Sequence, residues 1–216
     1  MKGALLSAWL VVLGGAALAA QDPAPVLERA GAAYQTVSTL SADFVQVVVN
    51  PLVGTPDTAR GTLYLMRPNH FAMRFTSPKG DRIVADGHHL WLYTPSSTPG
   101  QVLRSPIPAS GGLGPNLMGQ FVERPSERYY ARYLRADSLA SGWADVITLV
   151  PKAADQGYRE AVIWIDRDDA LLRRMEVVEE SGQRRIIQLG RLRVNPGVPQ
   201  REFRFAPPAG VRVVDL

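Results

Sequence analysis

The chain has 216 residues, a formal net charge of +4 at pH 7 and no cysteine. The lack of cysteine excludes disulfide bonds and thiol chemistry, so a secreted form of this chain must depend on its hydrophobic core. Basic residues are spread along the sequence, and no basic block indicates a nucleic acid or an anionic membrane surface as a partner.

The first twenty residues have the layout of a secretory signal peptide. Lys2 precedes the uncharged apolar run Ala4 to Leu18, and small residues then follow at the spacing that a signal peptidase needs. We expect cleavage after Ala19 or Ala20, which leaves one domain, residues 21–216. A retained membrane anchor is the alternative, but the run is short against the ~20 residues that span a bilayer. Because no cysteine is available for a lipid anchor, we expect a soluble, periplasmic protein.

After the signal peptide, the sequence predicts one helix and then a series of strands. Pro25 to Leu40 has apolar residues near 3.6-residue spacing, and its small residues 30–33 make a slim helix that can lie close to another surface. Asp86-Gly87 is a strong signal for a tight hairpin. The predicted strands in this part are 42–49, 60–67, 71–76, 82–85, 90–93 and 101–104.

The strand pattern is interrupted between Ser105 and Phe121 by a segment rich in glycine and proline. These residues forbid a long regular element, so we interpret the segment as a mobile insertion with one or two helical turns. Its apolar residues are Leu113, Leu117, Met118 and Phe121. Strands resume after it, and they are predicted at 129–134, 143–150, 161–166, 171–178, 184–193, 203–205 and 211–214.

These elements predict a mainly β fold with one antiparallel sheet of about eleven strands. A large antiparallel sheet needs a cover on its apolar face. The slim helix and the insertion are too small to form a complete second layer. We therefore expect a curved, barrel-like sheet with these two pieces lying over its mouth.

The sequence gives weak signals for enzymatic chemistry. It contains no G-x-S-x-G elbow, no Walker A loop and no H-E-x-x-H motif. His88 and His89 are adjacent on a predicted strand, so they point to opposite faces and cannot easily share a metal. The acidic pairs at 168–169 and 179–180 are solvated turn residues in the simplest interpretation. We expect no enzyme, no metal, no cofactor and no ATP hydrolysis.

The segment 61–75 lines one face of two strands with large apolar side chains. At period two these are Leu63, Leu65, Phe71, Met73 and Phe75. An ordinary packed core is one interpretation, and the wall of a cavity is the other. Two details favour a cavity: both faces of residues 89–93 are apolar, and the insertion supplies adaptable apolar residues such as methionine.

The same alternation places Arg67 on the apolar face. It is either a strand-end residue that extends to solvent or a hydrogen-bond donor, because a buried unpaired charge costs several kcal/mol. Helix C-terminal carbonyls on a covering lid are suitable acceptors. In that case Arg67 would act as a latch.

The order of several short motifs resembles the LolA family, periplasmic carriers that move lipoproteins from the inner to the outer membrane. The motifs are A-D-F-V-Q at 42–46, G-x-L-x-x-x-R-P-x-x-F at 61–71, D-G with L-W-x-Y-x-P at 86–95, L-x-P-K at 149–152 and F-x-F-x-P-P-x-G-V-x-V at 203–213. Each motif alone is weak, but together they cover nearly all of the chain after the signal peptide. The insertion is richer in glycine and proline than the family pattern, so we expect a short lid helix.

The resemblance implies an unclosed antiparallel β-barrel with a small α-helical lid and a cavity for acyl chains. In the closed form, the family's arginine at the position of Arg67 bonds to backbone carbonyls of the lid helix. The expected cavity residues are Phe44, Leu63, Leu65, Phe71, Met73, Phe75, Leu90, Trp91 and Leu92. The expected lid residues are Leu113, Leu117, Met118 and Phe121.

The resemblance also implies the partners of a carrier. These are lipoproteins as cargo, an inner-membrane ABC-type release complex as donor and an outer-membrane lipoprotein acceptor, with a monomeric carrier and no nucleic acid. Two alternatives stay open. A sensing or regulatory module on the same fold would be favoured by a further domain after the barrel, and a hydrolase of lipids or glycans is disfavoured by the missing nucleophile motif.

Overall fold

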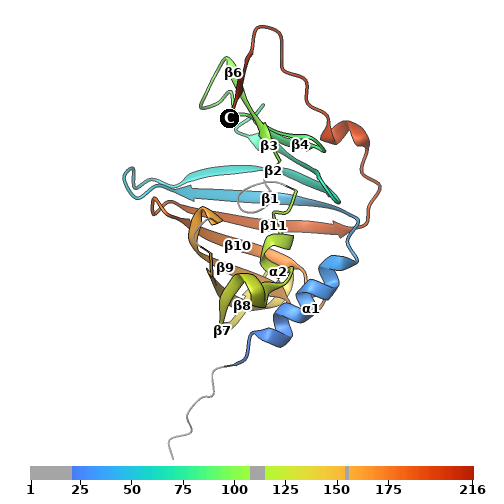
Figure 1. Ribbon diagram of the computed structural model, residues 1–216, viewed down its shortest axis with the longest axis vertical. Helices are drawn as coiled ribbons and strands as arrows, with labels where there is room; N and C mark the ends of the chain where they lie inside the picture. The colour runs from blue at the N-terminus through green and yellow to red at the C-terminus, as the bar shows by residue number, and fades with distance from the viewer. Residues whose placement is uncertain (1–20, 108–114, 154–155) are drawn as a thin grey trace, which may run out of the picture.

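Twelve strands form one sheet in the order β12-β6-β5-β4-β3-β2-β1-β11-β10-β9-β8-β7. A computed structural model describes residues 21–107, 115–153 and 156–216, and Figure 1 shows the sheet with the helices α1 and α2 on one side. The strands are β1 (Thr39–Val49), β2 (Asp57–Met66), β3 (His70–Ser77), β4 (Arg82–Asp86), β5 (His89–Tyr93), β6 (Gln101–Pro106), β7 (Tyr129–Leu139), β8 (Gly142–Pro151), β9 (Tyr158–Asp166), β10 (Leu172–Glu179), β11 (Arg184–Val194) and β12 (Arg212–Asp215). The helices are α1 (Ala24–Gln35), α2 (Gly119–Val122), α3 (Pro125–Arg128) and the 3-10 helix η2 (Gln200–Phe203).

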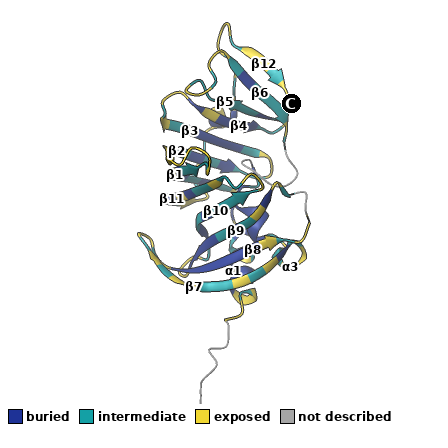
Figure 2. Ribbon diagram, turned by 90° about the vertical axis from the view of Figure 1, so that its left-hand side faces the viewer, coloured by how far each residue is buried: buried dark blue, intermediate teal, exposed yellow. Residues whose placement is uncertain are grey.

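The sheet is curved but not closed, because β12 and β7 are its two edges. Neighbouring strands pair antiparallel, except that β12 runs parallel to β6. The predicted mainly β, unclosed antiparallel architecture is confirmed, with twelve strands in place of about eleven. Figure 2 shows the curvature from the side, with buried residues along the central strands and exposed residues on β7.

The first helix and one predicted strand differ from the structure. The first helix ends at Gln35, because Thr39 and Leu40 already belong to β1, where Leu40 pairs with Leu65. Residues 203–205 do not form a strand, because Phe203 ends the helix η2 and packs onto the outer face of the sheet. The alternating phenylalanines therefore reflect burial against that face, since period two does not by itself require a strand partner.

The large side chains of β2 and β3 share the inner face, as predicted. Leu63, Leu65, Phe71 and Met73 are at most 1% exposed and belong to the main core cluster. Gly61 makes this packing possible, because a Cβ at that position would lie 1.9 Å from the Arg74 carbonyl oxygen. The outer face carries a smaller cluster, which the segment 195–211 covers on its way from β11 to β12.

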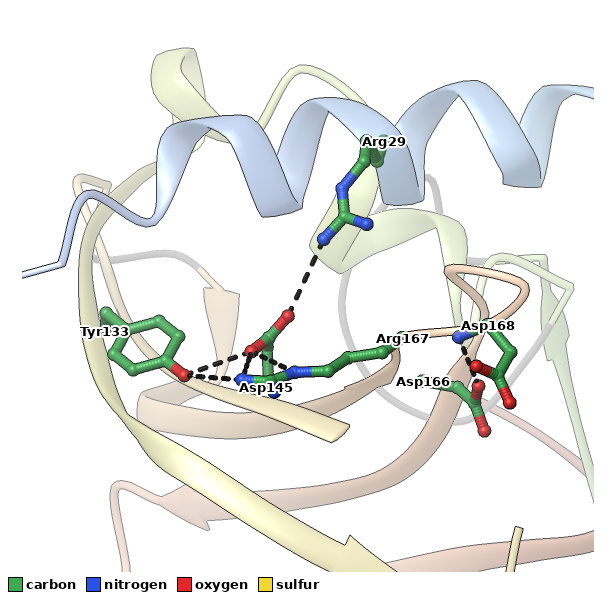
Figure 3. A network of polar contacts seen from close by, with 6 residues as sticks. All are labelled: Arg29, Tyr133, Asp145, Asp166, Arg167 and Asp168. Carbon is green, nitrogen blue, oxygen red and sulfur yellow. Dashed lines mark hydrogen bonds and ion pairs between the residues drawn. The ribbon is translucent and has the colours of Figure 1, made fainter. Parts of the chain in front are cut away.

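Helix α1 lies close to α2, as the small residues at 30–33 predicted. A Cβ on Gly31 would lie 2.8 Å from the carbonyl oxygen of Val122. A polar network fastens the first half of α1 to the sheet (Figure 3). In it the buried carboxylate of Asp145 on β8 accepts hydrogen bonds from Arg167 and from the Tyr133 hydroxyl, and it lies 3.6 Å from the Arg29 guanidinium of α1.

Candidate functional site

The segment 115–123, here named the lid segment, closes the inner side of the curved sheet. It consists of a turn followed by the four-residue helix α2, so the predicted short lid helix is confirmed. Leu117, Met118 and Phe121 are at most 3% exposed and belong to the main core cluster. Leu113, the fourth predicted lid residue, lies outside the described residues.

Hydrogen bonds to one carbonyl hold the end of α2. The Gln120 carbonyl oxygen accepts from the Tyr129 hydroxyl at 2.8 Å and from Arg128 Nη1 at 3.0 Å. The Tyr129 and Tyr158 hydroxyls lie 2.7 Å apart. Burial raises the pKa of both tyrosines, so both stay protonated at neutral pH and can donate. These bonds satisfy a backbone acceptor that the short helix leaves without an intrahelical partner.

Arg67 joins the lid segment to α1 at the end of β2. Its Nη1 donates to the Tyr34 carbonyl oxygen at 3.1 Å, and its Nη2 donates to Glu123 Oε1 at 3.2 Å. The guanidinium carbon also lies 4.9 Å from the centre of the Tyr34 ring. The carbonyl partner of Arg67 therefore belongs to the last turn of α1, whereas the sequence and its family resemblance pointed to carbonyls of the lid helix. The contact with the lid segment is the Glu123 carboxylate.

Tyr34 couples the two covering pieces. Burial, partly offset by the positive charge of Arg67, raises the pKa of its hydroxyl to about 12. Its ring packs on Gly119, where a Cβ would lie 2.6 Å from Tyr34 Cε1. Movement of the lid segment away from the sheet therefore removes contacts of Tyr34 and of Arg67 together.

An apolar cavity of about 400 Å³ lies between the lid segment and the sheet. Its wall comes mainly from the lid segment and from two separate parts of the sheet, β5–β6 and β9–β11, and it includes polar side chains such as Glu179 and Arg185. The lining residues are Leu90, Leu92, Ser105, Leu117, Gln120, Phe121, Gln156, Gly157, Tyr158, Met175, Val177, Glu179, Arg185, Ile187 and Leu216.

Four of the residues predicted for the cavity and the lid line this space: Leu90, Leu92, Leu117 and Phe121. The other predicted cavity residues on the inner face are packed into the closed core, and Phe75 lies at its border, 5.0 Å from the Phe44 ring. Trp91 does not fit the expectation, because it lies on the outer face and packs against Phe205. Its neighbours Leu90 and Leu92 point inward, so the strand alternation itself was informative.

Sequence reasoning missed the cavity wall formed by β10 and β11. Met175 and Val177 on β10 and Ile187 on β11 line the cavity. These strands alternate apolar and polar residues, and that signal was available in the sequence. The alternation does not say which distant strands face one another, because strand order within a sheet is a tertiary property.

In the described parts of the chain, no cluster of three or more His, Cys, Asp or Glu side chains is placed to hold a metal ion. No helix in residues 21–107, 115–153 or 156–216 has the length and apolar character needed to cross a membrane.

The fold and the site define an unclosed antiparallel barrel whose apolar interior is closed by a short helical segment. Residues 35–206 match the family model "Outer membrane lipoprotein carrier protein LolA". The chain belongs to the LolA family. Membership of a carrier family agrees with the prediction that this protein is not an enzyme.

Relatives of nearly equal length support the assignment. An outer-membrane lipoprotein carrier protein of Methylobacillus flagellatus is 30% identical over 189 residues, which cover 87% of this chain and 88% of the relative. The protein of the same name from Chromobacterium violaceum is 30% identical, with 92% of each chain covered.

Solved structures agree on the fold. An uncharacterized conserved protein of Thermus thermophilus superposes with a TM-score of 0.56 at 15% identity and covers 91% of this chain and 100% of its own. The Pseudomonas aeruginosa MucA/MucB complex includes a chain with a TM-score of 0.51 at 14% identity, covering 91% of this chain and 64% of that one. At such identities the likeness concerns the fold alone.

Proposed function

We propose that this protein carries lipoproteins through the periplasm to the outer membrane, with the acyl chains of the cargo held against the inner face of the sheet. The observation that carries the proposal is the apolar cavity under the lid segment, in a chain of the lipoprotein carrier family. Apolar chains need a water-free space, and an inner face lined by leucine, methionine and phenylalanine provides one.

The closed cavity is too small for a complete cargo, so loading requires the lid segment to move. Pockets that hold one drug-sized ligand measure ~300–1,000 Å³, and this cavity of about 400 Å³ is at the lower end of that range. Two or three acyl chains need more room. Withdrawal of Phe121, which is fully buried, would open the neighbouring core, and Phe71 and Met73 would then become part of the cavity wall.

The strength of acyl-chain burial determines how the cargo must leave. Burying one methylene contributes roughly 0.8 kcal/mol. Two or three chains of about 16 carbons therefore exceed the ~20 kcal/mol limit of non-covalent affinity. Such a ligand does not dissociate into water, so release is a direct transfer to another apolar site. We therefore propose a powered release complex in the inner membrane as donor and a lipoprotein acceptor at the outer membrane.

The mechanism assigns a role to the contacts of Arg67. In the empty state they hold α1 and the lid segment together over the sheet. Cargo chains displace Phe121 and its neighbours, and these contacts break. On transfer to the acceptor the contacts form again, which favours the closed, empty carrier and opposes return of the cargo.

Two adjacent residues of β10 provide a test of the cavity. Val177 lines the cavity, whereas its neighbour Val178 projects from the opposite face of the strand; both are half-buried. We expect Val177→Glu to abolish the release of lipoproteins from spheroplasts into solution, because a carboxylate in the wall opposes acyl-chain burial. Val178→Glu is the matched control and should release lipoproteins as the wild-type protein does.

Each variant is first compared with the wild type by circular dichroism and thermal unfolding. Native mass spectrometry then tests for a bound lipoprotein directly. Equal release by folded Val177→Glu and Val178→Glu proteins would exclude this cavity as the acyl-chain site. Wild-type protein that captures no lipoprotein would contradict the carrier function itself.

A further inference from the structure

An exposed apolar tip projects from the sheet between β1 and β2. Leu52 is 94% exposed and Val53 is 67% exposed. Single exposed apolar residues are common on protein surfaces and need no explanation. Two adjacent ones at the end of a hairpin are different, because both side chains can enter the same apolar medium at once.

Three backbone amides of this tip already have acceptors within the hairpin. The Leu52 amide donates to Asn50 Oδ1 at 2.9 Å. The amides of Val53 and Gly54 donate to the Asn50 carbonyl oxygen at 3.2 Å and 3.0 Å. An unsatisfied amide is costly to bury in lipid. With three successive amides bonded to Asn50, the tip can enter an apolar medium without leaving these donors unpaired.

The tip follows the part of β1 that pairs with a strand of the cavity wall. Val48 and Val49, which lead into it, pair with Arg185 and Arg184 of β11. Arg185 lines the cavity. The tip also meets the turn that precedes β11, since a Cβ on Gly182 would lie 3.5 Å from Pro51 Cγ. A surface that receives the tip is therefore next to the cavity.

Three exposed cations accompany the tip at the same end of the sheet. They are Arg60 on β2, Lys79 in the turn after β3 and Arg82 at the start of β4. In the described part of the chain, the ion pairs do not include any of the three. Arg60 is distant in sequence from the other two, and the pairing of β2 with β3 brings it to their end of the sheet.

We propose that the tip at Leu52 and Val53 docks this protein on an anionic phospholipid bilayer, with Arg60, Lys79 and Arg82 at the headgroups. Apolar insertion and attraction to anionic lipids are the two contributions that hold peripheral proteins at membranes. A stable protein partner would bury ~800 Å² on each side, far more than two side chains at a tip provide. The observations therefore favour a bilayer, and the small contact suits brief docking.

The absence of cysteine allows a direct test. A Leu52→Cys variant can be labelled at that position alone with the environment-sensitive fluorophore NBD. His88→Cys is the matched control, because His88 is exposed in the turn between β4 and β5, at the opposite end of these strands. With vesicles of phosphatidylethanolamine and phosphatidylglycerol, we expect a blue shift and a gain in intensity for the label at 52 and no change at 88. A label at 52 that stays in water would overturn the proposal.

Vesicle co-sedimentation of the unlabelled protein separates the two contributions. The double variant Leu52→Ser/Val53→Ser should bind these vesicles at least about tenfold more weakly, because both apolar side chains are lost. The variant Arg60→Gln/Lys79→Gln/Arg82→Gln should lose only the preference over neutral phosphatidylcholine vesicles. That preference should also vanish near 1 M salt, where the Debye length is about 3 Å.

The proposal is independent of lipoprotein carriage, because the vesicle experiments use the empty protein. Serine variants that bind vesicles as the wild type does would overturn it. If such variants also failed to transfer cargo to a purified acceptor protein, the tip would be a protein-docking element and not a bilayer anchor. Loss of vesicle binding with normal capture of lipoproteins would support the docking tip and leave the proposed function intact.

Discussion

The sheet is covered on both faces by chain segments that bury a phenylalanine, and the two covers are built differently. On the inner face the lid segment buries Phe121, which is 0% exposed; on the outer face the segment 195–211, here named the outer strap, buries Phe203, which is 1% exposed. Beside Phe121 lies the apolar cavity. Phe203 instead packs against Ala72 and Val84.

The two covers also differ in how they are fastened. The outer strap runs from β11 to β12, and the lid segment likewise lies in the chain between two strands, β6 and β7. A half-exposed Arg74 lies 3.1 Å from the buried Glu202 within the outer strap. The lid segment contains only the four-residue helix α2. Side chains from outside the lid segment, Arg67, Arg128 and Tyr129, bond to it.

Because the apolar cavity lies beside the lid segment whereas the outer strap packs directly on the sheet, we infer that the outer strap is a permanent cover and the lid segment a releasable one. A cover held by a few side-chain bonds can open locally at a small fraction of the cost of unfolding. The same burial of a large aromatic side chain therefore serves stability on one face and a conformational change on the other.

The largest expected effect is on stability at the outer strap. Phe203→Ala removes a fully buried ring and should lower the free energy of unfolding by ~3–5 kcal/mol. For a domain of this size that corresponds to roughly 10 °C in Tm. Phe121→Ala should cost less, because its effect on unfolding cannot exceed the free energy of opening the lid segment. Chemical and thermal unfolding of both variants measures the difference.

Equal losses in the two variants would contradict the comparison, because the lid segment would then be as firmly integrated as the outer strap. Lipoprotein transfer provides the second measurement. Phe203→Ala should transfer cargo normally at temperatures where it is folded, whereas Phe121→Ala should change the balance between loading and release.

The second largest expected effect is on cargo transfer, and it distinguishes Arg67, which contacts the lid segment, from Arg74, which contacts the outer strap. Arg67→Leu removes bonds to α1 and to the lid segment, and a bond from a charged donor contributes ~1.5–3 kcal/mol. The equilibrium between the closed and the open lid segment should shift at least about tenfold toward the open state, since 1.4 kcal/mol is tenfold. We expect normal loading and at least about tenfold slower transfer to a purified acceptor. Arg67→Lys should rescue transfer only in part, because one ammonium cannot bond to both partners in the guanidinium geometry.

Arg74→Leu is the matched control on the opposite face. It breaks the pair with Glu202 in the outer strap, so it should lower stability without changing either loading or transfer. If Arg67→Leu loads poorly but releases normally, or equals the wild type in both steps, Arg67 is a strand-end residue without a latch function.

The comparison also explains how far the sequence alone could predict this molecule. Alternation assigned Leu63, Leu65, Phe71 and Met73 to one face, because period two fixes the direction of side chains. It could not assign the phenylalanines at 203–205, since burial on the outside of a sheet produces the same pattern as a strand. For this reason residues 203–205 of the outer strap were predicted as a strand.

The site was harder to predict than the fold for a similar reason. The position of Arg67 on the inner face followed from alternation, but its acceptors did not, because Tyr34 and Glu123 come from segments whose placement depends on tertiary packing. The wall formed by Met175, Val177 and Ile187 depends on strand order in the same way. The basic cluster beside the apolar tip was also hidden, since only the folded sheet brings Arg60 to the same end as Lys79 and Arg82.

The smallest expected effect is a change in stability at alkaline pH that arises from Tyr34, at the junction of α1 and the lid segment. Its pKa is raised from 10.0 to about 12, chiefly by burial. Below pH 10 the hydroxyl is neutral in both the folded and the unfolded protein, so its full contribution to the free energy of unfolding is present there. Above pH 10 the unfolded chain is stabilised by losing this proton, and the contribution to the free energy of unfolding declines as the pH rises through 12. At pH 11 the free energy of unfolding should be lower by about 1.4 kcal/mol.

The control for this effect is Tyr34→Phe, which keeps the ring over Gly119 and under Arg67 and removes the titrating group. Other tyrosines also titrate in this range, so the informative quantity is the difference in unfolding free energy between the two proteins from pH 9 to pH 11. That difference should shift by about 1.4 kcal/mol in favour of the variant. Because the lid segment is the releasable cover, hydrogen exchange of the amides of Gln120 and Phe121 should accelerate over the same interval in the wild type and less in the variant. A difference in stability that is constant with pH would show that the Tyr34 hydroxyl is not held neutral by the closed junction.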